Sequence, residues 1–502
     1  NVVGRILSAY IEPEMTEICD LHVALAQQVR SVIDQELSTS IFIQSAPAEK
    51  PGTGFSLSRL LGSGAKKKVP VATESPEQRE QRIIASWNQK ANSSEERLAA
   101  AIFAELASIA RAIVAKHGRL RGDKALLTTL VTGLVCNNYG SEIIGEAIAP
   151  MVAQAAAREG FPLLPAQAEP IVINVKGASA SGKSTMRPLQ KKHTEKLGIN
   201  WHDFALISPD IWRKFLLDYD ALGEAYKYAG TLVGDEIPIV DQKLDRYIAQ
   251  KAELGKISHL LIDRFRFDSF APGKDTEEGS NLLTRFGHTV YLTFMVTPPE
   301  ATVERAWIRG LQVGRFKAVD DLLDHNVEAF KGIPALFFTW ALRKDKIVYY
   351  EFLDNSVARG DKPRTIAFGI NGELNILDFK CMFDIERYTK ININAHDPAD
   401  VYPPGSEMDS ALNAGFLVKC ARQIPRINFV ERGCGQIYAS MESGKMSWID
   451  PDMIKRVLDD EAAMTAFSAM VPKFVESRGE FKQQPAMPLP DEARLHTMGC
   501  LQ

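Results

Sequence analysis

The sequence lacks the marks of zinc-binding, secreted and membrane-spanning chains. Its six cysteines are scattered, with no CxxC pair and no Cys/His spacing for a metal, so we expect reduced thiols and no zinc site. The first residues, NVVGRILSAYIEPEM, show no cleavable leader. No apolar run approaches the roughly 20 residues that span a bilayer, so no membrane partner is expected.

The chain also lacks a strong charge bias. Its formal net charge is −4, with 24% charged and 45% apolar residues, which are ordinary globular proportions and exclude a fibrous or wholly disordered chain. An acidic balance gives no reason to expect a nucleic-acid partner. With 502 residues the chain exceeds one hydrophobic core, so several domains are expected.

Four regions are predicted along the chain. The first two are residues 1–74, an amphipathic helix at 15–37 followed by a Ser-, Gly-, Pro- and Lys-rich connector at 38–73, and residues 75–165, a helical region. In the helical region we expect a helix start at Ser75-Pro76, a capping box at Ser93–Glu96, a helix end at Gly118 and one helical stretch at 126–158. Residues 166–395 form the third region. Residues 396–502 form a mixed extension of unknown role with a loose, proline-containing tail.

From residue 170 short apolar runs alternate with helical patterns. The runs are IVINV, FALIS, HLLID, TVYLTFMV and KIVYYEFL, and a hairpin with Asn371-Gly372 at its turn follows them. This alternation predicts an α/β fold with a doubly wound, mostly parallel sheet, preceded by a helical extension and followed by a mixed one.

A glycine-rich turn directly follows the first of these runs, in IVINVKGASASGKSTMRP. Gly177–Ser184 fits GxxxxGKS, with a strand before it and a helix after it, as a phosphate-binding loop requires. Backbone N–H groups of such a loop cradle phosphates at a helix N-terminus. We therefore predict ATP and Mg²⁺ as cofactors, with Lys183 at the β- and γ-phosphates and Ser184 on the metal. The predicted ATP-binding residues are Gly177, Ala178, Ser179, Ala180, Ser181, Gly182, Lys183, Ser184 and Thr185.

Other residues discriminate between the classes of protein that use this loop. A GTPase needs an Asn-Lys-x-Asp strand for base recognition, and the chain has none. A motor-type ATPase needs a strand that ends in a pair of carboxylates, whereas HLLID ends in Asp263 alone. A single carboxylate at that place suits Mg²⁺, bound directly or through water.

A small-molecule kinase needs a general base and arginines over the phosphates, and both are present. In FALISPDIWRKFL, Asp210 follows a strand and opens a helix, whose N-terminus favours the ionised carboxylate that accepts a hydroxyl proton. The alternative is a helix N-cap. In ERAWIRGLQVGRF, Arg305, Arg309 and Arg315 can close over a triphosphate, and Arg309 is predicted to bind ATP together with the loop residues. Their alternative is a solvated helix face.

These motifs, in their order along the chain, resemble the zeta-toxin kinases. The resemblance covers residues 168–395 and includes the loop, SPD, a helical insertion from Tyr219 to Leu254, LLID, TPPEATVERAWIRGLQVGR and HNVEAF. It implies a P-loop kinase-like fold, Asp210 as catalytic base, Lys183 and Ser184 in the loop, and Arg305 and Arg315 as catalytic lid arginines. It also implies a substrate-binding role for Asp245 and an antitoxin partner.

One departure from the zeta-toxin pattern points to a different substrate. After LLID the sequence reads RFRF, and Arg264 and Arg266 with their two phenylalanines would suit a large, planar, charged substrate. The alternative is that half of these four are strand residues facing the core. With the N-terminal extension, the chain is also similar to the AvrRxo group of injected bacterial effectors, which are zeta-like kinases that phosphorylate NAD on the adenosine ribose.

The AvrRxo resemblance implies NAD as acceptor at its 3′-hydroxyl, and a toxin or virulence-effector role. It further implies an antitoxin or chaperone partner and a cytoplasmic location in the producer, or delivery into a host cell by a signal that is not cleaved. Three alternatives stay open at this stage. They are a UDP-N-acetylglucosamine kinase toxin, a polynucleotide kinase and a non-catalytic, nucleotide-dependent interaction module.

Overall fold

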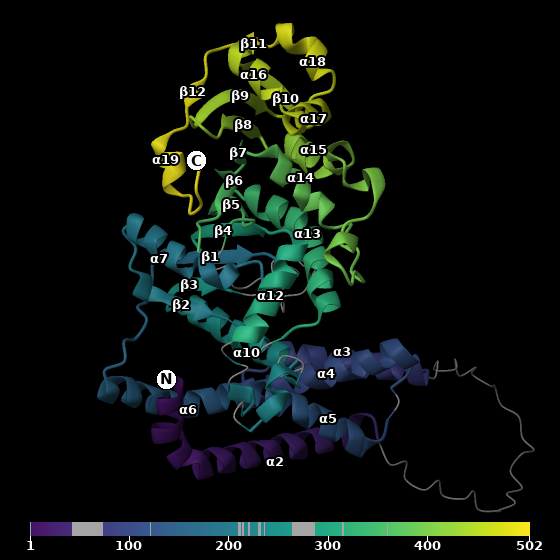
Figure 1. The fold of residues 1–502 in the computed structure, drawn as a ribbon. Helices are drawn as coiled ribbons and strands as arrows, with labels where there is room; N and C mark the ends of the chain where they lie inside the picture. Colours follow the sequence, from purple (N-terminus) through teal and green to yellow (C-terminus); the bar gives the residue numbers. More distant parts are fainter. Residues whose placement is uncertain are drawn as a thin grey trace, which may run out of the picture. The chain divides into compact units, whose positions relative to one another are not determined.

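The computed structural model divides into two compact units. It describes residues 2–42, 74–120, 122–208, 236–263, 287–313, 316–358 and 360–501, and between 209 and 235 only 212, 215–218, 221–228 and 232–234. The units are Asn1–Leu163 and Leu164–Gln502, coloured purple to blue and teal to yellow in Figure 1. Most of the predicted connector, residues 43–73, lies outside the described residues.

The first unit is helical, as predicted for the N-terminal extension. A short N-terminal stretch contains α1 (Val2–Ile6), a π-helical turn (Leu7–Ile11) and a 3-10 turn (Glu12–Glu14). The main helices are α2 (Met15–Ser40), α3 (Pro76–Ser93), α4 (Arg97–His117), α5 (Lys124–Asn137) and α6 (Tyr139–Glu159).

The ends of these helices test the predicted caps. Ser75 caps α3 with Pro76 at its first position, as predicted, and with Gln78 it also forms a reciprocal capping box that was not predicted, at 3.2 and 3.0 Å. The predicted capping box at Ser93–Glu96 is wrong, because no side chain caps α4 and the Ser94 hydroxyl donates to the carbonyl of Glu96 instead. Gly118, at φ 74°, ends α4 as predicted. The stretch at 126–158 is two helices, separated at Asn138.

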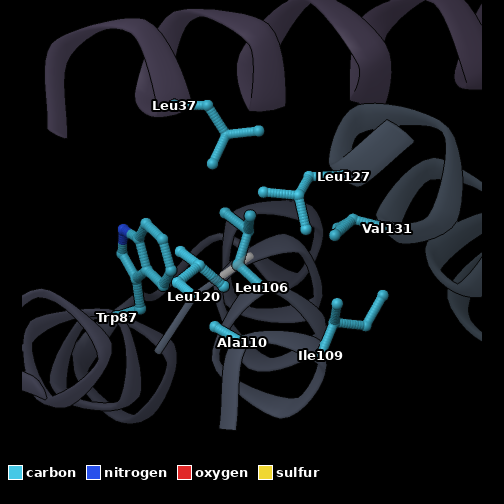
Figure 2. A pocket seen from close by; sticks show the side chains of 8 residues that line it. All are labelled: Leu37, Trp87, Leu106, Ile109, Ala110, Leu120, Leu127 and Val131. Atoms are coloured by element: carbon cyan, nitrogen blue, oxygen red, sulfur yellow. The ribbon is translucent and has the colours of Figure 1, made fainter. Parts of the chain in front are cut away.

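Apolar side chains from four of these helices form the core of the first unit. Trp87 is fully buried there, and its indole N–H donates to Glu36 at 2.8 Å. Figure 2 shows a small void in this core, with a volume of about 10 Å³ and walls from Leu37, Trp87, Leu106, Ile109, Ala110, Leu120, Leu127 and Val131. A void of one water's size with apolar walls holds no ligand, so this core serves stability.

One helix in the described part of the chain, α4, is long and apolar enough to cross a membrane by length and composition alone. Its mean hydropathy reaches 1.9 over the best window, so the expectation that no stretch qualifies is wrong for this helix. Core helices pass the same test, and α4 contributes Leu98, Ile102, Leu106, Ala107 and Ala110 to the core of the first unit.

The second unit is built on one 12-stranded sheet. Its strands follow the order β11-β10-β9-β8-β7-β6-β5-β4-β1-β3-β2, and β12 pairs with β9. The strands are β1 (Ile171–Lys176), β2 (Phe204–Ile207), β3 (His259–Ile262), β4 (Thr289–Val296), β5 (Ile347–Asp354), β6 (Arg364–Ile370), β7 (Glu373–Ile376), β8 (Arg426–Glu431), β9 (Gln436–Glu442), β10 (Lys445–Ile449), β11 (Lys482–Gln483) and β12 (Met487–Pro488).

The first five strands form the predicted parallel sheet. All four pairings in β2-β3-β1-β4-β5 are parallel, and β1 lies between β3 and β4. The strands β1 to β5 coincide with the five apolar runs to within one residue at each end. The β6–β7 hairpin turns at Asn371 and Gly372, both at positive φ (23° and 81°), as the Asn-Gly signal predicts.

Helices cover both faces of the parallel strands, which makes the sheet doubly wound. On one face α10 (Glu236–Glu253) and α13 (Val319–Ala341) pack through residues such as Ile248, Phe330 and Phe337. On the other face α7 (Arg187–Lys196) contributes Leu189, beside β1 and β4. The fold is therefore α/β with a doubly wound, mostly parallel sheet at its centre, as predicted.

The mixed C-terminal extension continues the same sheet. Strand β7 pairs in parallel with β8, and β9 and β10 extend the sheet beyond β8 in antiparallel pairs. Helix α12 (Pro299–Val313) lies earlier in the chain, between β4 and β5. The extension is preceded by α14 (Phe379–Arg387) and contains α15 (Gly415–Gln423), α16 (Pro451–Val457) and α17 (Glu461–Met470), with two short helices, α18 (Phe474–Ser477) and α19 (Asp491–Leu495). These elements form a common core with the parallel strands.

The C-terminal tail is docked against the sheet, so the expectation of a loose tail is wrong. The N–H groups of Met498 and Gly499 donate to the Glu351 carboxylate on β5, at 2.8 and 3.0 Å. The Met498 side chain packs with Met186, which follows the glycine-rich turn. The tail pairs with Thr365 through the carbonyl of Cys500. The proline-containing composition of the tail does not reveal that these N–H groups bind a carboxylate on the sheet.

Candidate functional site

The glycine-rich turn lies between β1 and α7, at the carboxyl end of the central parallel strand. After β1 ends at Lys176, Ala180 and Gly182 take positive φ of 61° and 102°, and a 3-10 turn at Lys183–Met186 leads into α7. Left-handed residues alternating with ordinary ones turn successive N–H groups toward one concavity that binds anions. The strand–turn–helix context predicted for the loop is therefore present.

Three side chains fix the backbone of this loop through one carbonyl. The Ser181 carbonyl accepts hydrogen bonds from Asn355 Nδ2 at 2.7 Å, Thr297 Oγ1 at 3.0 Å and Arg305 Nη1 at 3.5 Å. Gly182 is required beside them, because a Cβ would lie 2.4 Å from Asn355 Nδ2 and φ is strongly positive. The loop is thus held in shape before any ligand binds.

Lys183 lies across the mouth of the loop. Its ammonium donates to the carbonyls of Gly177 at 2.8 Å and Ala178 at 2.7 Å. The hydroxyl of Thr185 donates to the Gly182 carbonyl at 2.6 Å, while Ser184 is exposed at the start of the following turn. This places a cation and an exposed hydroxyl on the segment where a P-loop holds phosphates and a metal.

Asp263 follows β3 and lies near the same loop. Because β3 is the direct neighbour of β1, the carboxyl end of β3 is close to the glycine-rich turn. Arg187, the first residue of α7, approaches Asp263 with 3.6 Å between Nη2 and Oδ2. The backbone N–H of Asp263 donates to the carbonyl of Ile207 on β2. The strand order therefore brings Asp263 to the loop, as the HLLID pattern predicted.

The donors around this position fit Mg²⁺. Ser184 and Asp263 offer oxygen atoms only, and Mg²⁺ prefers oxygen ligands, usually one or two from protein with phosphates and water completing the shell. Among the residues that the structure describes, no group of three or more His, Cys, Asp and Glu side chains could hold a metal ion by itself. A site completed by nucleotide phosphates is consistent with both observations.

The predicted lid arginines occupy different positions. Arg305, half-buried on α12, donates from Nη2 to the carbonyls of Asn355 at 2.7 Å and Val357 at 3.3 Å, and burial lowers its guanidinium pKa. In this structure it therefore supports the loop backbone. Arg309 lies about one turn further along α12 and is half-buried. Arg315 lies outside the described residues, so its catalytic role stays a prediction.

Of the predicted catalytic base and acceptor-binding residues, the structure describes only Asp245. Asp210, Arg264 and Arg266 lie outside the described residues, so their roles stay predictions. Asp245 lies on α10 and is buried, with 5% of its surface exposed. Its helix packs on the sheet through Ile248. A substrate-binding role for Asp245 remains a prediction.

A groove lies beside Arg187, along the edge of the sheet. Its volume is about 440 Å³, and it is lined by Arg187, Pro188 and Lys191 of α7, by Trp201, by Phe204 and Leu206 of the edge strand β2, and by Leu261 of the neighbouring strand β3. Two basic and two aromatic side chains therefore meet in one open groove. The ion pair of Arg187 with Asp263 links this groove to the loop.

The residues that hold the backbone of the loop and of the C-terminal tail beside it were not identified from the sequence. Thr297 and Asn355 directly follow β4 and β5, so the rule that ligand sites gather at the carboxyl ends of parallel strands could have identified them. Glu351 and Met498 gave no such signal. They act through contacts between β5 and a tail almost 150 residues away.

Comparison with known proteins finds similarity only to parts of solved structures. No protein-family model and no curated protein matches the chain. A chain of the PezAT chromosomal toxin–antitoxin system of Streptococcus pneumoniae is 20% identical, with 40% of this chain and 75% of that chain covered and a TM-score of 0.27. A candidate kinase from Chloroflexus aurantiacus J-10-fl is 25% identical, with 31% and 77% covered and a TM-score of 0.22. Both TM-scores are low, so neither likeness assigns a function to this chain.

Proposed function

We propose that this chain is an ATP-dependent kinase that transfers the γ-phosphoryl group to a hydroxyl of a small molecule. The observation that carries the proposal is the loop itself, with Ala180 and Gly182 at positive φ, Lys183 across its mouth and Asp263 beside it. A pre-shaped anion site with one acidic neighbour suits a triphosphate with Mg²⁺.

In the proposed reaction each residue has one task. Lys183 would move from the two loop carbonyls to the β- and γ-phosphate oxygens. Ser184 and Asp263 would hold Mg²⁺, which would supply positive charge at the phosphates. Asp210 accepts the proton of the acceptor hydroxyl, whose oxygen forms a bond to the γ-phosphorus. The bond from that phosphorus to the β,γ-bridging oxygen breaks, and ADP leaves with the negative charge, which Arg309 and Arg315 neutralise.

The acceptor that we favour is NAD, phosphorylated at the 3′-hydroxyl of its adenosine ribose. Its support from the sequence is the resemblance to the AvrRxo group, which rests on RFRF after LLID and on the helical N-terminal extension. The groove beside Arg187 supports a planar, charged acceptor of that kind, because aromatic faces stack on rings and basic side chains pair with phosphates. With this acceptor we also propose a role as an effector or toxin. Its partner would be an antitoxin or a chaperone, and it would act in the cytoplasm of the producer or of a host cell.

The test is a product assay on the full-length protein. Wild type is incubated with ATP, Mg²⁺ and, separately, NAD, a UDP-sugar and an oligonucleotide, and each acceptor is analysed by mass spectrometry. We expect NAD to become about 80 Da heavier, the mass of one phosphoryl group. If the UDP-sugar gains the mass instead, the chain is a UDP-sugar kinase of the zeta-toxin kind. If the oligonucleotide gains it, the chain is a polynucleotide kinase.

Asp210→Asn separates transfer from binding. We expect this variant to keep its affinity for ATP while transfer falls about 10²- to 10⁴-fold, as is usual for a lost general base. Transfer near the wild-type rate would remove Asp210 from the mechanism. If wild type binds ATP but modifies no acceptor, the interaction-module alternative is the better description.

A further inference from the structure

A second lysine lies at the phosphate loop, on the connection between α12 and α13. The ammonium of Lys317 lies 2.6 Å from His325 Nδ1, and the same ring nitrogen lies 2.8 Å from the hydroxyl of Ser179 in the loop. Ser179 is the third residue of the GxxxxGKS segment. One imidazole on α13 therefore joins Lys317 to the loop.

The hydrogen-bond roles in this cluster follow from the chemistry of lysine. An ammonium can only donate, so His325 Nδ1 accepts from Lys317 and the ring is neutral. Burial, followed by the charge of Lys317, lowers the pKa of His325 to about 4, and Lys183 acts in the same direction, while Asp321 and Asp324 oppose it. At neutral pH His325 is thus an uncharged acceptor close to two cations, Lys317 and Lys183.

The backbone around Lys317 is held by aromatic packing. The ring of the preceding residue, Phe316, lies on Gly310 of α12 so closely that a Cβ there would be 2.3 Å from a ring carbon. The same ring packs against Trp307, with 5.2 Å between centroids. Asn326 ties α13 to α12 through the Thr302 hydroxyl at 2.8 Å. The packing of Phe316 and the bond between α12 and α13 therefore fix the backbone on both sides of Lys317.

Two lysine ammonium groups at one anion-binding loop suit the part of a bound nucleotide that carries the most negative charge, its terminal phosphates. Lys183 of a P-loop reaches the β- and γ-phosphates. The imidazole nitrogen that lies 2.6 Å from the Lys317 ammonium also lies 2.8 Å from the hydroxyl of Ser179 in the loop, so the ammonium is close to the loop that would hold those phosphates. The neutral ring of His325 accepts the hydrogen bond of Lys317, and a phosphate oxygen would accept that bond more strongly.

We propose that Lys317 binds the terminal phosphate of the nucleoside triphosphate, and that His325 and Phe316 are its positioning residues. The proposal rests on the proposed function only in taking Gly177–Ser184 as the nucleotide site. It adds a phosphate-binding residue outside the GxxxxGKS segment and outside the arginines of α12. The cation distinguishes ATP from ADP, because only the triphosphate carries the group that it contacts.

Calorimetric titration of the full-length protein with ADP and with a non-hydrolysable ATP analogue, both with Mg²⁺, tests this proposal. Lys317→Met is expected to weaken binding of the analogue about 10- to 100-fold, the usual range for a lost charged hydrogen bond, and to leave ADP binding within about threefold. Lys317→Arg should restore most of the preference for the analogue. Lys331→Met, which removes an exposed lysine from the same helix as His325, is the matched control and should change neither affinity.

The positioning residues have their own readout. His325→Asn is expected to reduce the preference for the analogue over ADP by part of the Lys317→Met effect, with the melting temperature of the ligand-free protein kept near wild type. Equal losses for ADP and the analogue in Lys317→Met, or no loss for either, would overturn the proposal.

Lys183→Ala separates this inference from the proposed function. If Lys183→Ala abolishes binding of both nucleotides while Lys317→Met changes neither, the loop is a nucleotide site and only the assignment of Lys317 fails. If wild type binds neither nucleotide, the proposed function fails together with the inference.

Discussion

The two halves of the sheet bury polar side chains for different purposes. In the C-terminal half, Asn375, Asn428 and Ser440 hydrogen-bond one another across β7, β8 and β9, at 3.0 and 2.9 Å. In the parallel half, Thr297 and Asn355 donate to the carbonyl of a loop residue, Ser181. The first set holds neighbouring strands to each other, whereas the second holds a loop in a shape that suits an anion.

This difference shows where function can be found in a large sheet. Buried polar groups that satisfy one another within the strands report on folding and register. Buried polar groups that fix backbone outside the strands report on a binding site, because ordering a loop costs conformational entropy that regular structure does not require there. Both sets are buried, so burial alone does not separate them.

The largest effects are expected from truncating core side chains in each half. Phe467→Ala, in a cluster with Phe429 and Phe474, should lower the free energy of unfolding by about 3–5 kcal/mol and leave nucleotide affinity unchanged. Met498→Ala should cost about 2–5 kcal/mol and also weaken nucleotide binding, because Met498 packs against Met186 next to the loop. Urea unfolding and nucleotide titration of both variants measure the two effects.

The comparison breaks if Phe467→Ala weakens nucleotide binding as much as Met498→Ala at equal loss of stability. That result would mean that nucleotide affinity follows the stability of the whole sheet. It would also remove the reason for treating the docked tail as a support of the phosphate loop.

The next largest expected effect is a loss of unfolding free energy when the pH falls. His193 on α7 is 4% exposed, neither of its ring nitrogens has a hydrogen-bond partner among the described residues, and burial lowers its pKa to about 4. The unfolded chain binds a proton near the ordinary pKa of about 6.5 while the folded chain does not, so stability falls as the pH falls from about 6.5 to 4. The loss approaches about 3 kcal/mol for His193 by this linkage, and His325 acts in the same window.

Urea midpoints at several pH values between 4 and 8 measure this dependence. His193→Phe should flatten the curve below pH 6.5, because the titrating group is removed from an aromatic environment beside Tyr291. His202→Phe, which changes an exposed histidine, is the control and should leave the slope unchanged. An identical slope in wild type and His193→Phe would contradict the assignment.

The smallest effects distinguish the two polar sets directly. Asn428→Ala should cost about 1–3 kcal/mol of stability, because it leaves Asn375 and Ser440 without a partner that they use now, and should leave nucleotide affinity unchanged. Asn355→Ala should weaken nucleotide binding by a similar free energy, because the Ser181 carbonyl loses its shortest hydrogen bond. Reversed outcomes would show that the two sets had been assigned the wrong way round.

Much of the parallel half could be predicted from the sequence because its signals are local. Each of the first five strands is a continuous apolar run, and the loop from Gly177 to Ser184 is one contiguous motif. Ser75 and Gly118 mark helix ends through residues within the same turn. In such cases the residues that cause the structure are also neighbours in the chain.

The rest depends on contacts between distant segments, which no short pattern carries. Asn355 meets the loop across 174 positions, and Met498 meets Glu351 across 147. The tail was predicted to be loose because its prolines suggest disorder, whereas a buried carboxylate receives its N–H groups. The predicted capping box at Ser93–Glu96 failed because the helix begins after Glu96 without a side-chain cap. The roles of Asp210, Arg264, Arg266 and Arg315 stay predictions.

The most direct test of the account is an experimental structure of the full-length protein with Mg²⁺ and a non-hydrolysable ATP analogue. The account predicts the triphosphate in the loop between Gly177 and Ser184, with the Lys183 ammonium moved from the carbonyls of Gly177 and Ala178 to the β- and γ-phosphate oxygens. An analogue bound elsewhere at full occupancy, with Lys183 still on those two carbonyls, would contradict it.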